Sequence, residues 1–275
     1  MNKLRRQLLA GPYLLWIIGF ILLPLLMILY YAFTNSNGEF TLEYIMAITS
    51  HTNLKALGLS LWLGVLCTVI CLLLSYPLAM ILNGLNIKNQ SFIVFIFMLP
   101  MWMNFLIRTY SLMTILGDSG VINTFLTTIG LQPIKMINTG GAVILGMVYN
   151  YLPYMILPIY TAIVKIDNSL YEAAEDLGSN GLQKFRRVIF PLSIPGIVSG
   201  ITMVFVPAVS TFVVSKMLGG GTELLLGDLI EQQFLGGAYN PQLGAAISLV
   251  MMVIVVLCMV VMNRFGEGEE QAVML

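Results

Sequence analysis

The feature that most constrains this chain is a series of apolar stretches, each long enough to cross a lipid bilayer as a helix. A hydrocarbon core about 30 Å thick requires roughly 20 mostly apolar helical residues. Six stretches of 20 to 26 residues meet this condition: residues 12–33, 57–82, 91–116, 142–164, 194–215 and 243–262. Backbone polar groups inside a bilayer must be hydrogen-bonded within the chain. The sequence therefore predicts an all-α integral membrane protein with six transmembrane helices.

The composition agrees with a chain that lies mostly in lipid. Apolar residues make up 58% of the sequence and charged residues 9%, whereas soluble proteins carry about 25% charged residues. These values exclude a soluble enzyme, a disordered tail and a nucleic-acid-binding protein with a basic patch. The three cysteines lie in apolar stretches, as small core residues do, and His51 has no partner at metal-ligand spacing. We therefore expect no metal or cofactor in this chain.

The distribution of lysine and arginine predicts the orientation of the chain, because cytoplasmic loops are richer in these residues. An even number of crossings places both termini on one side. With a cytoplasmic N-terminus, nine cations fall inside and three outside: Lys3, Arg5, Arg6, Lys88, Lys165, Lys184, Arg186, Arg187 and Arg264, against Lys55, Lys135 and Lys216. We expect cytoplasmic termini, a location in the cell membrane, and a first stretch kept as an anchor. Because no loop exceeds 29 residues, residues 1–275 should form one transmembrane domain.

The predicted cytoplasmic loop, residues 165–193, carries the most informative pattern. Ser169 and Glu172 have the spacing of a capping box, so a helix should begin there. An apolar stripe follows at helical spacing, formed by Leu170, Ala173, Ala174 and Leu177. Gly178 should end this helix. A second short helix should follow, and Pro191 and Pro195 should break the path into the fifth stretch. Such a hairpin either lies in the lipid headgroups or packs against another protein.

The spacing in this loop resembles the EAA loop of permease subunits in ATP-binding-cassette (ABC) importers. The family pattern is Glu-Ala-Ala, three residues, Gly, nine residues and Ile-x-Leu-Pro. The corresponding positions here are Glu172-Ala173-Ala174, Gly178 and Val188-Ile189-Phe190-Pro191. Val188 and Phe190 replace Ile and Leu but keep the apolar character, and the Gly and Pro positions are intact.

The resemblance implies the type I importer permease fold, with a coupling helix that fits a groove of a cytoplasmic ATPase. The ATPase-coupling residues would be Glu172, Ala173, Ala174, Leu177, Gly178 and Pro191. The sequence has no G-x-x-x-x-G-K-[ST] phosphate-binding loop. ATP and Mg²⁺ would therefore be bound by the partner ATPase, and this chain would be a transport subunit without catalytic residues.

Polar and aromatic side chains inside the apolar stretches predict where a translocation pathway lies, because such groups face a cavity or a neighbouring helix. Asn104 and Arg108 share one helix face, and Asn150 and Tyr154 share another. Aromatic rings can hold ammonium groups at about 0.5 to 2 kcal/mol each, although they also anchor helices at the membrane surface. The pathway candidates are Trp102, Asn104, Arg108, Tyr110, Asn150 and Tyr154.

Arg108 requires an explanation of its own, because a guanidinium in a membrane needs an anion or other acceptor nearby. Its partner could be a carboxylate of a second permease, an outer acid such as Asp118, or an anionic substrate. The predicted outer loops contain six acids and three lysines, and this negative net charge would attract cations. Sorting of lysine and arginine to the cytoplasmic side would leave the same excess of acids outside. Three of these acids are further pathway candidates: Glu223, Asp228 and Glu231.

A second resemblance concerns the substrate. The segments Leu99 to Tyr110, Asp176 to Gly178 and Val214 to Gly220 resemble the B-type permeases of spermidine/putrescine importers. This implies a heterodimer with a second permease, two copies of a cytoplasmic ABC ATPase, and an extracytoplasmic polyamine-binding protein. The alternatives are a permease for an anion or an amino acid, which would suit Arg108, and a secondary transporter. A secondary transporter would need an acid within a span, and no acid lies in the predicted spans.

Overall fold

The structure is a computed structural model that describes residues 11–84, 90–222 and 224–273. Within these ranges the chain is mostly helical, and the β-pairing is limited to one isolated bridge between Thr34 and Phe40. The predicted all-α class is confirmed. In the same ranges, five helical segments are long and apolar enough to cross a membrane: Gly11–Phe33, His51–Gly84, Gly140–Val164, Gly181–Val209 and Pro241–Met262. The sixth crossing and the orientation of the termini stay predictions.

The chain divides into two compact units, which are Met1–Lys55 with Leu229–Ile254, and Ala56–Asp228 with Val255–Leu275. Three helices continue through the boundaries between these units: α5 (His51–Gly84), α14 (Leu226–Leu235) and α15 (Pro241–Val273). The single transmembrane domain expected from the sequence stays a prediction.

In the first unit, the first predicted span forms one apolar helical segment made of α2 (Gly11–Ile17), the π-helical turn η1 (Ile18–Leu22) and α3 (Leu23–Phe33). Pro24 lies in the first turn of α3 and has no N–H to donate, so the preceding helical turn widens. In that wider turn the N–H of Leu23 bonds to the carbonyl of Ile18. The short helix α4 (Glu43–Ala47) follows.

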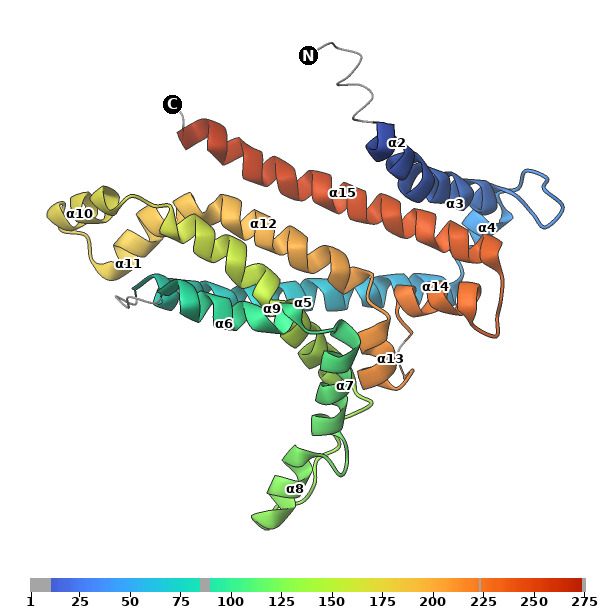
Figure 1. Cartoon of the computed structure of the whole chain (residues 1–275), viewed down its shortest axis with the longest axis horizontal. Coiled ribbons are helices and arrows are strands. Elements are labelled where there is room, and N and C mark those ends of the chain that lie inside the picture. Colours follow the sequence, from blue (N-terminus) through green and yellow to red (C-terminus); the bar gives the residue numbers. More distant parts are fainter. Residues whose placement is uncertain (1–10, 85–89, 223, 274–275) are drawn as a thin grey trace. The chain divides into compact units, whose positions relative to one another are not determined.

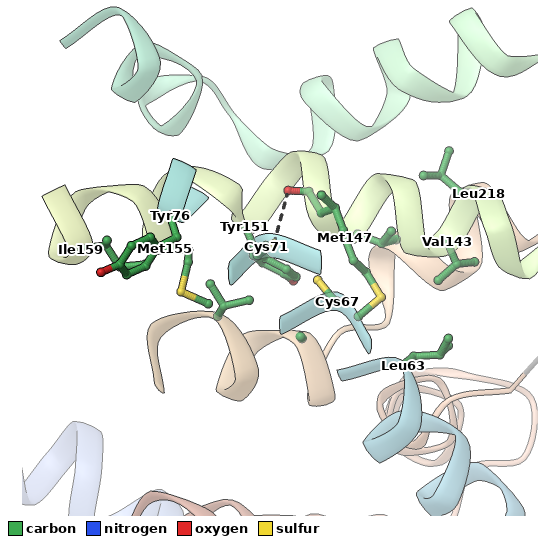
Figure 2. Packing of buried hydrophobic residues seen from close by; sticks show 14 of the residues in the cluster. Leu63, Cys67, Cys71, Tyr76, Val143, Met147, Tyr151, Met155, Ile159 and Leu218 are labelled. Atoms are coloured by element: carbon green, nitrogen blue, oxygen red, sulfur yellow. Dashed lines mark hydrogen bonds between the residues drawn. The ribbon is translucent and has the colours of Figure 1, made fainter. Parts of the chain in front are cut away.

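The core of the second unit lies between α5, α9 (Gly140–Val164) and α12 (Phe190–Val209). Figure 2 shows Cys67 and Cys71 of α5 beside Met147 and Tyr151 of α9. Both cysteines are fully buried and carry free thiols. The prediction that they are small core residues is confirmed.

Helices α9 and α12 pack closely because two glycines of α12 face α9. A Cβ atom on Gly196 would lie 2.5 Å from the Ala162 Cβ and 2.6 Å from the Pro158 carbonyl oxygen. One on Gly200 would lie 2.7 Å from the Met155 sulfur. Small residues let helix backbones approach in membranes, so this G-x-x-x-G sequence sets the α9–α12 distance.

The third predicted span, residues 91–116, is not one continuous helix. Helix α6 (Gln90–Trp102) ends before Asn104, and α7 (Phe105–Leu116) begins after it. The Asn104 side chain accepts hydrogen bonds from the backbone N–H groups of Leu106 and Ile107, which is the action of an N-cap. With 13 and 12 residues, each half is about 20 Å long, too short to cross the bilayer alone.

The fifth predicted span, residues 194–215, also differs. One helical segment runs over Gly181–Val209, formed by α11 (Gly181–Lys184), the π-helical turn η2 (Phe185–Ile189) and α12. A separate helix, α13 (Val213–Gly219), begins after a break at Ser210–Phe212. Pro191 therefore does not break the path into this span as predicted, because it occupies the first turn of α12 and η2 absorbs its missing hydrogen bond.

Candidate functional site

The predicted cytoplasmic loop folds as a helical hairpin of α10 (Asn168–Asp176) and α11, which we call the coupling hairpin (Figure 1). The N-cap of α10 is Asp167 rather than the predicted Ser169: its carboxylate accepts a hydrogen bond from the Ser169 N–H at 2.9 Å. This hydrogen bond lowers the pKa of the Asp167 carboxyl. The charged cap therefore stabilises α10 at neutral pH, and its contribution is lost as the pH falls through the lowered pKa.

Helix α10 ends at Asp176, and Gly178 terminates it as predicted. Gly178 has φ +74°, in the left-handed region that favours glycine. The Ser179 N–H bonds to the Ala174 carbonyl at 3.0 Å, and the Gly178 N–H bonds to the Glu175 carbonyl at 2.8 Å. These two bonds define a Schellman motif, which turns the chain sharply into α11.

The apolar stripe of the coupling hairpin is exposed. Leu177 is 89% exposed and Leu170 44% exposed, and Ala173 is also open to the surroundings. Glu172 lies beside the stripe and is exposed, whereas Ala174 is half-buried. Leucines exposed to this degree at helical spacing are typical of a surface that binds another protein.

Lys184 of α11 contacts two side chains of α10 and so links the two helices of the coupling hairpin. Its ammonium forms an ion pair with Glu175 and lies 5.9 Å from the ring centroid of Tyr171, both on α10. Burial raises the pKa of the Tyr171 phenol, and the Lys184 charge opposes this rise. A capping box that the sequence pattern did not predict lies at the start of α11, where the side chains of Asn180 and Gln183 accept hydrogen bonds from each other's backbone N–H groups.

We expect Lys184→Met to loosen the hairpin slightly, because methionine keeps the apolar stem but loses the ammonium. A partly exposed ion pair contributes about 0.5 kcal/mol, so hydrogen exchange at the α10 amides should become about twofold faster. High salt should produce the same change in the wild type and none in the variant. Equal exchange rates in both proteins at low salt would contradict this role of Lys184.

Arg108 of α7 is the most buried charge among the pathway candidates that the structure describes, at 3% exposure. Its Nη1 atom donates to the Pro100 carbonyl at 2.7 Å, and its guanidinium carbon lies 5.9 Å from the ring centroids of Phe105 and Tyr149. Among the described residues its partner is therefore a carbonyl, not Asp118. Because Pro100 lies in the last turn of α6, Arg108 satisfies a helix C-terminal acceptor across the break at Asn104.

Asn150 of α9 is fully buried next to this region. Its amide nitrogen donates to the Gly146 carbonyl at 2.9 Å and to the Thr109 hydroxyl at 3.3 Å. Its Oδ1 atom and the Nε of Arg108 are buried without a partner in the described part of the chain. Polar side chains thus join α7 and α9 through Asn150 and Thr109, and Asn104 acts as the N-cap of α7. Whether these faces line a pathway stays a prediction.

The remaining pathway candidates are distributed between exposed and buried positions. Trp102 is 79% exposed and Tyr110 61% exposed, and Tyr154 is half-buried. The Asp228 carboxylate is buried and accepts hydrogen bonds from the Ser215 hydroxyl and the Leu225 N–H, both at 2.9 Å. Glu231 is half-buried on α14, and Glu223 lies outside the described residues. The roles of all these residues in a pathway stay predictions.

Comparison with known proteins identifies the family. Residues 75–268 match the model described as the binding-protein-dependent transport system inner membrane component. The chain belongs to this family. It is therefore an inner membrane component of a transport system and not an enzyme, and the predicted resemblance to importer permeases is confirmed.

The relatives of this inner membrane component agree with that assignment. It is 40% identical over 260 residues to the spermidine/putrescine transport system permease protein PotB of Haemophilus influenzae, covering 92% of this chain and 91% of that one. For PotB of Escherichia coli the identity is 37% over 257 residues, covering 90% and 93%. A solved bacterial ABC transporter involved in the import of alginate has the same fold, with a TM-score of 0.81 at 20% identity and 96% coverage of both chains.

Proposed function

We propose that this chain is the B-type permease subunit of an ABC importer that carries spermidine or putrescine across the inner membrane. The observation that carries the coupling mechanism is the exposed stripe of the coupling hairpin, which ends in the Schellman motif at Gly178. A rigid, exposed apolar turn at the end of a helical segment can fit a groove on another protein. Movement of that protein is then transmitted into α9 and α12, which flank the hairpin.

The proposal includes the partners. A second permease completes the translocation pathway as a heterodimer, and two copies of a cytoplasmic ABC ATPase bind and hydrolyse ATP with Mg²⁺. An external polyamine-binding protein delivers the substrate, in agreement with the binding-protein dependence of the family. The chain crosses the membrane six times with both termini in the cytoplasm.

The substrate proposal is supported by the relatives and by the exposed rings of Trp102 and Tyr110, which can hold ammonium groups. Arg108 does not favour an anionic substrate, because its side chain is 3% exposed and bonds to the Pro100 carbonyl. A buried guanidinium that satisfies a carbonyl acts in helix packing.

The partners are tested by purifying the tagged chain from its native membrane in mild detergent and identifying the co-eluting proteins. We expect an ABC ATPase and a second permease at a ratio of two ATPase chains to one of each permease. Purification of this chain alone, from membranes that contain an ABC ATPase, would contradict the proposal.

We expect Glu231→Gln to lower spermidine uptake at limiting substrate, because it removes one negative charge from the predicted outer side. Loss of one partly screened attraction of about 1 kcal/mol corresponds to a fivefold higher apparent KM with an unchanged maximal rate. Asp228→Asn is a less specific test, since it also disturbs the bonds to Ser215 and Leu225. Unchanged uptake by the Glu231 variant at every spermidine concentration would remove this residue from the pathway.

A further inference from the structure

An aromatic cluster lies where the coupling hairpin joins the membrane-spanning helices. The ring of Tyr76 on α5 meets the ring of Phe185 on η2 edge to face, with centroids 5.6 Å apart. Phe190, at the start of α12, lies 6.3 Å from Tyr76 and 6.1 Å from Phe185. The π-helical turn η2, which directly follows the hairpin, therefore packs on α5.

A hydrogen-bond chain crosses the same contact. The hydroxyl oxygens of Tyr76 and Ser193 are 2.7 Å apart, and the Ser193 hydroxyl lies 2.9 Å from the Phe190 carbonyl. The serine has one proton, and the carbonyl can only accept. When that proton goes to the carbonyl, the Tyr76 hydroxyl donates to Ser193. Both side chains are buried, at 9% and 0% exposure, so water cannot easily replace this bond.

The helices on each side of the cluster both carry a proline within them, Pro77 in α5 and Pro195 in α12. The segment Gly181–Val209 is one uninterrupted helix through η2, so displacement of the hairpin reaches Ser193 without an intervening loop. Helix α5 carries Pro77 next to Tyr76, and a proline inside a helix removes one backbone hydrogen bond and permits bending. The cluster thus joins the helix that continues from the hairpin to a point where α5 can bend.

We propose that Tyr76 is a positioning residue for transport, which makes α5 follow the movement of α12 through its bond to Ser193. The proposal rests on the function proposed above, because it requires an ATPase that moves the coupling hairpin. It adds a specific connection from the hairpin to a third helix, α5. Such a connection carries coupling only when both helices change position together.

The test uses the complete transporter, with both permeases, the ATPase and the binding protein, in proteoliposomes. Spermidine uptake and ATP hydrolysis are measured together for Tyr76→Phe, Ser193→Ala and the double variant. We expect about fivefold less spermidine per ATP in each single variant, with the ATPase still bound. The double variant should lose no more than either single one, because all three lack the same bond.

Tyr151→Phe is the matched control. The Tyr151 hydroxyl also crosses between two helices, donating to the Pro207 carbonyl at 3.3 Å, but it lies away from the hairpin. Its loss should lower thermal stability as Tyr76→Phe does and leave the spermidine-to-ATP ratio unchanged. An unchanged ratio in Tyr76→Phe, equal losses in Tyr151→Phe, or additive losses in the double variant would overturn the role of Tyr76.

A second readout does not depend on the substrate. Spin labels at Leu73→Cys on α5 and Met203→Cys on α12, both exposed positions, report whether the two helices move together. When ATP is added, the distance distribution should stay narrow in the wild type and broaden in Tyr76→Phe. A narrow distribution in Tyr76→Phe would overturn the inference. ATP hydrolysis without spermidine uptake in the wild type would instead refute the proposed substrate.

Discussion

Replacing Gly178 by aspartate is expected to abolish ATPase binding and transport while the chain still inserts into the membrane. Gly178 has φ +74°, and a residue with a Cβ atom costs about 1 kcal/mol or more in this conformation. The new carboxylate would also lie at the C-terminal end of α10, where a negative charge is unfavourable, next to Glu175 and Asp176. Both effects open the Schellman motif, so the ATPase recovered by co-purification should fall more than tenfold.

Gly181→Asp provides the matched control within the same hairpin. A Cβ atom on Gly181 meets nothing within 4 Å, and its φ is not positive. As the first residue of α11, it can accept a negative charge, which is favourable at a helix N-terminus. This variant should bind the ATPase normally. Normal ATPase recovery with Gly178→Asp, or equal losses in both variants, would contradict the role of the hairpin turn.

Replacing Gly196 by leucine should strongly destabilise the packing of α9 against α12. The Cβ atom alone would lie 2.6 Å from the Pro158 carbonyl oxygen, a backbone atom that cannot rotate away. Overpacking of this kind costs about 3 kcal/mol, and the apparent melting temperature in detergent should fall by about 5 °C or more. Size-exclusion chromatography after stepwise heating measures this change.

Gly58→Leu is the corresponding control, because Gly58 also lies in a membrane-length helix and its Cβ would meet nothing within 4 Å. Its melting temperature should stay within about 1 °C of the wild type. If Gly196→Leu were as stable as Gly58→Leu, close packing of α9 and α12 could not depend on the glycine.

Hydropathy predicts most of the membrane-length helices, because a helix that crosses lipid must be long and apolar whatever its tertiary contacts are. It failed where a polar residue interrupts such a segment. Residues 91–116 have the composition of one span, but Asn104 caps a new helix and Arg108 satisfies the end of the preceding one. A proline four residues before an asparagine was the available signal for this break.

The coupling hairpin was largely predictable because its caps and its glycine act locally. The error at Ser169 arose because Asp167 offers a stronger acceptor two residues earlier. Long-range contacts had no sequence signal: the bond between Tyr76 and Ser193 joins residues 117 positions apart, and the partner of Arg108 depends on how the chain bends at Asn104. Such contacts are fixed by packing and not by periodicity.

The most direct test of the proposed mechanism is spermidine uptake into proteoliposomes that contain this chain and its second permease, with and without the ATPase. We predict uptake only when the ATPase, ATP and the loaded binding protein are all present, and no uptake driven by a proton gradient alone. Sustained spermidine accumulation by the permeases without the ATPase would contradict the claim that the hairpin couples this chain to a separate source of energy.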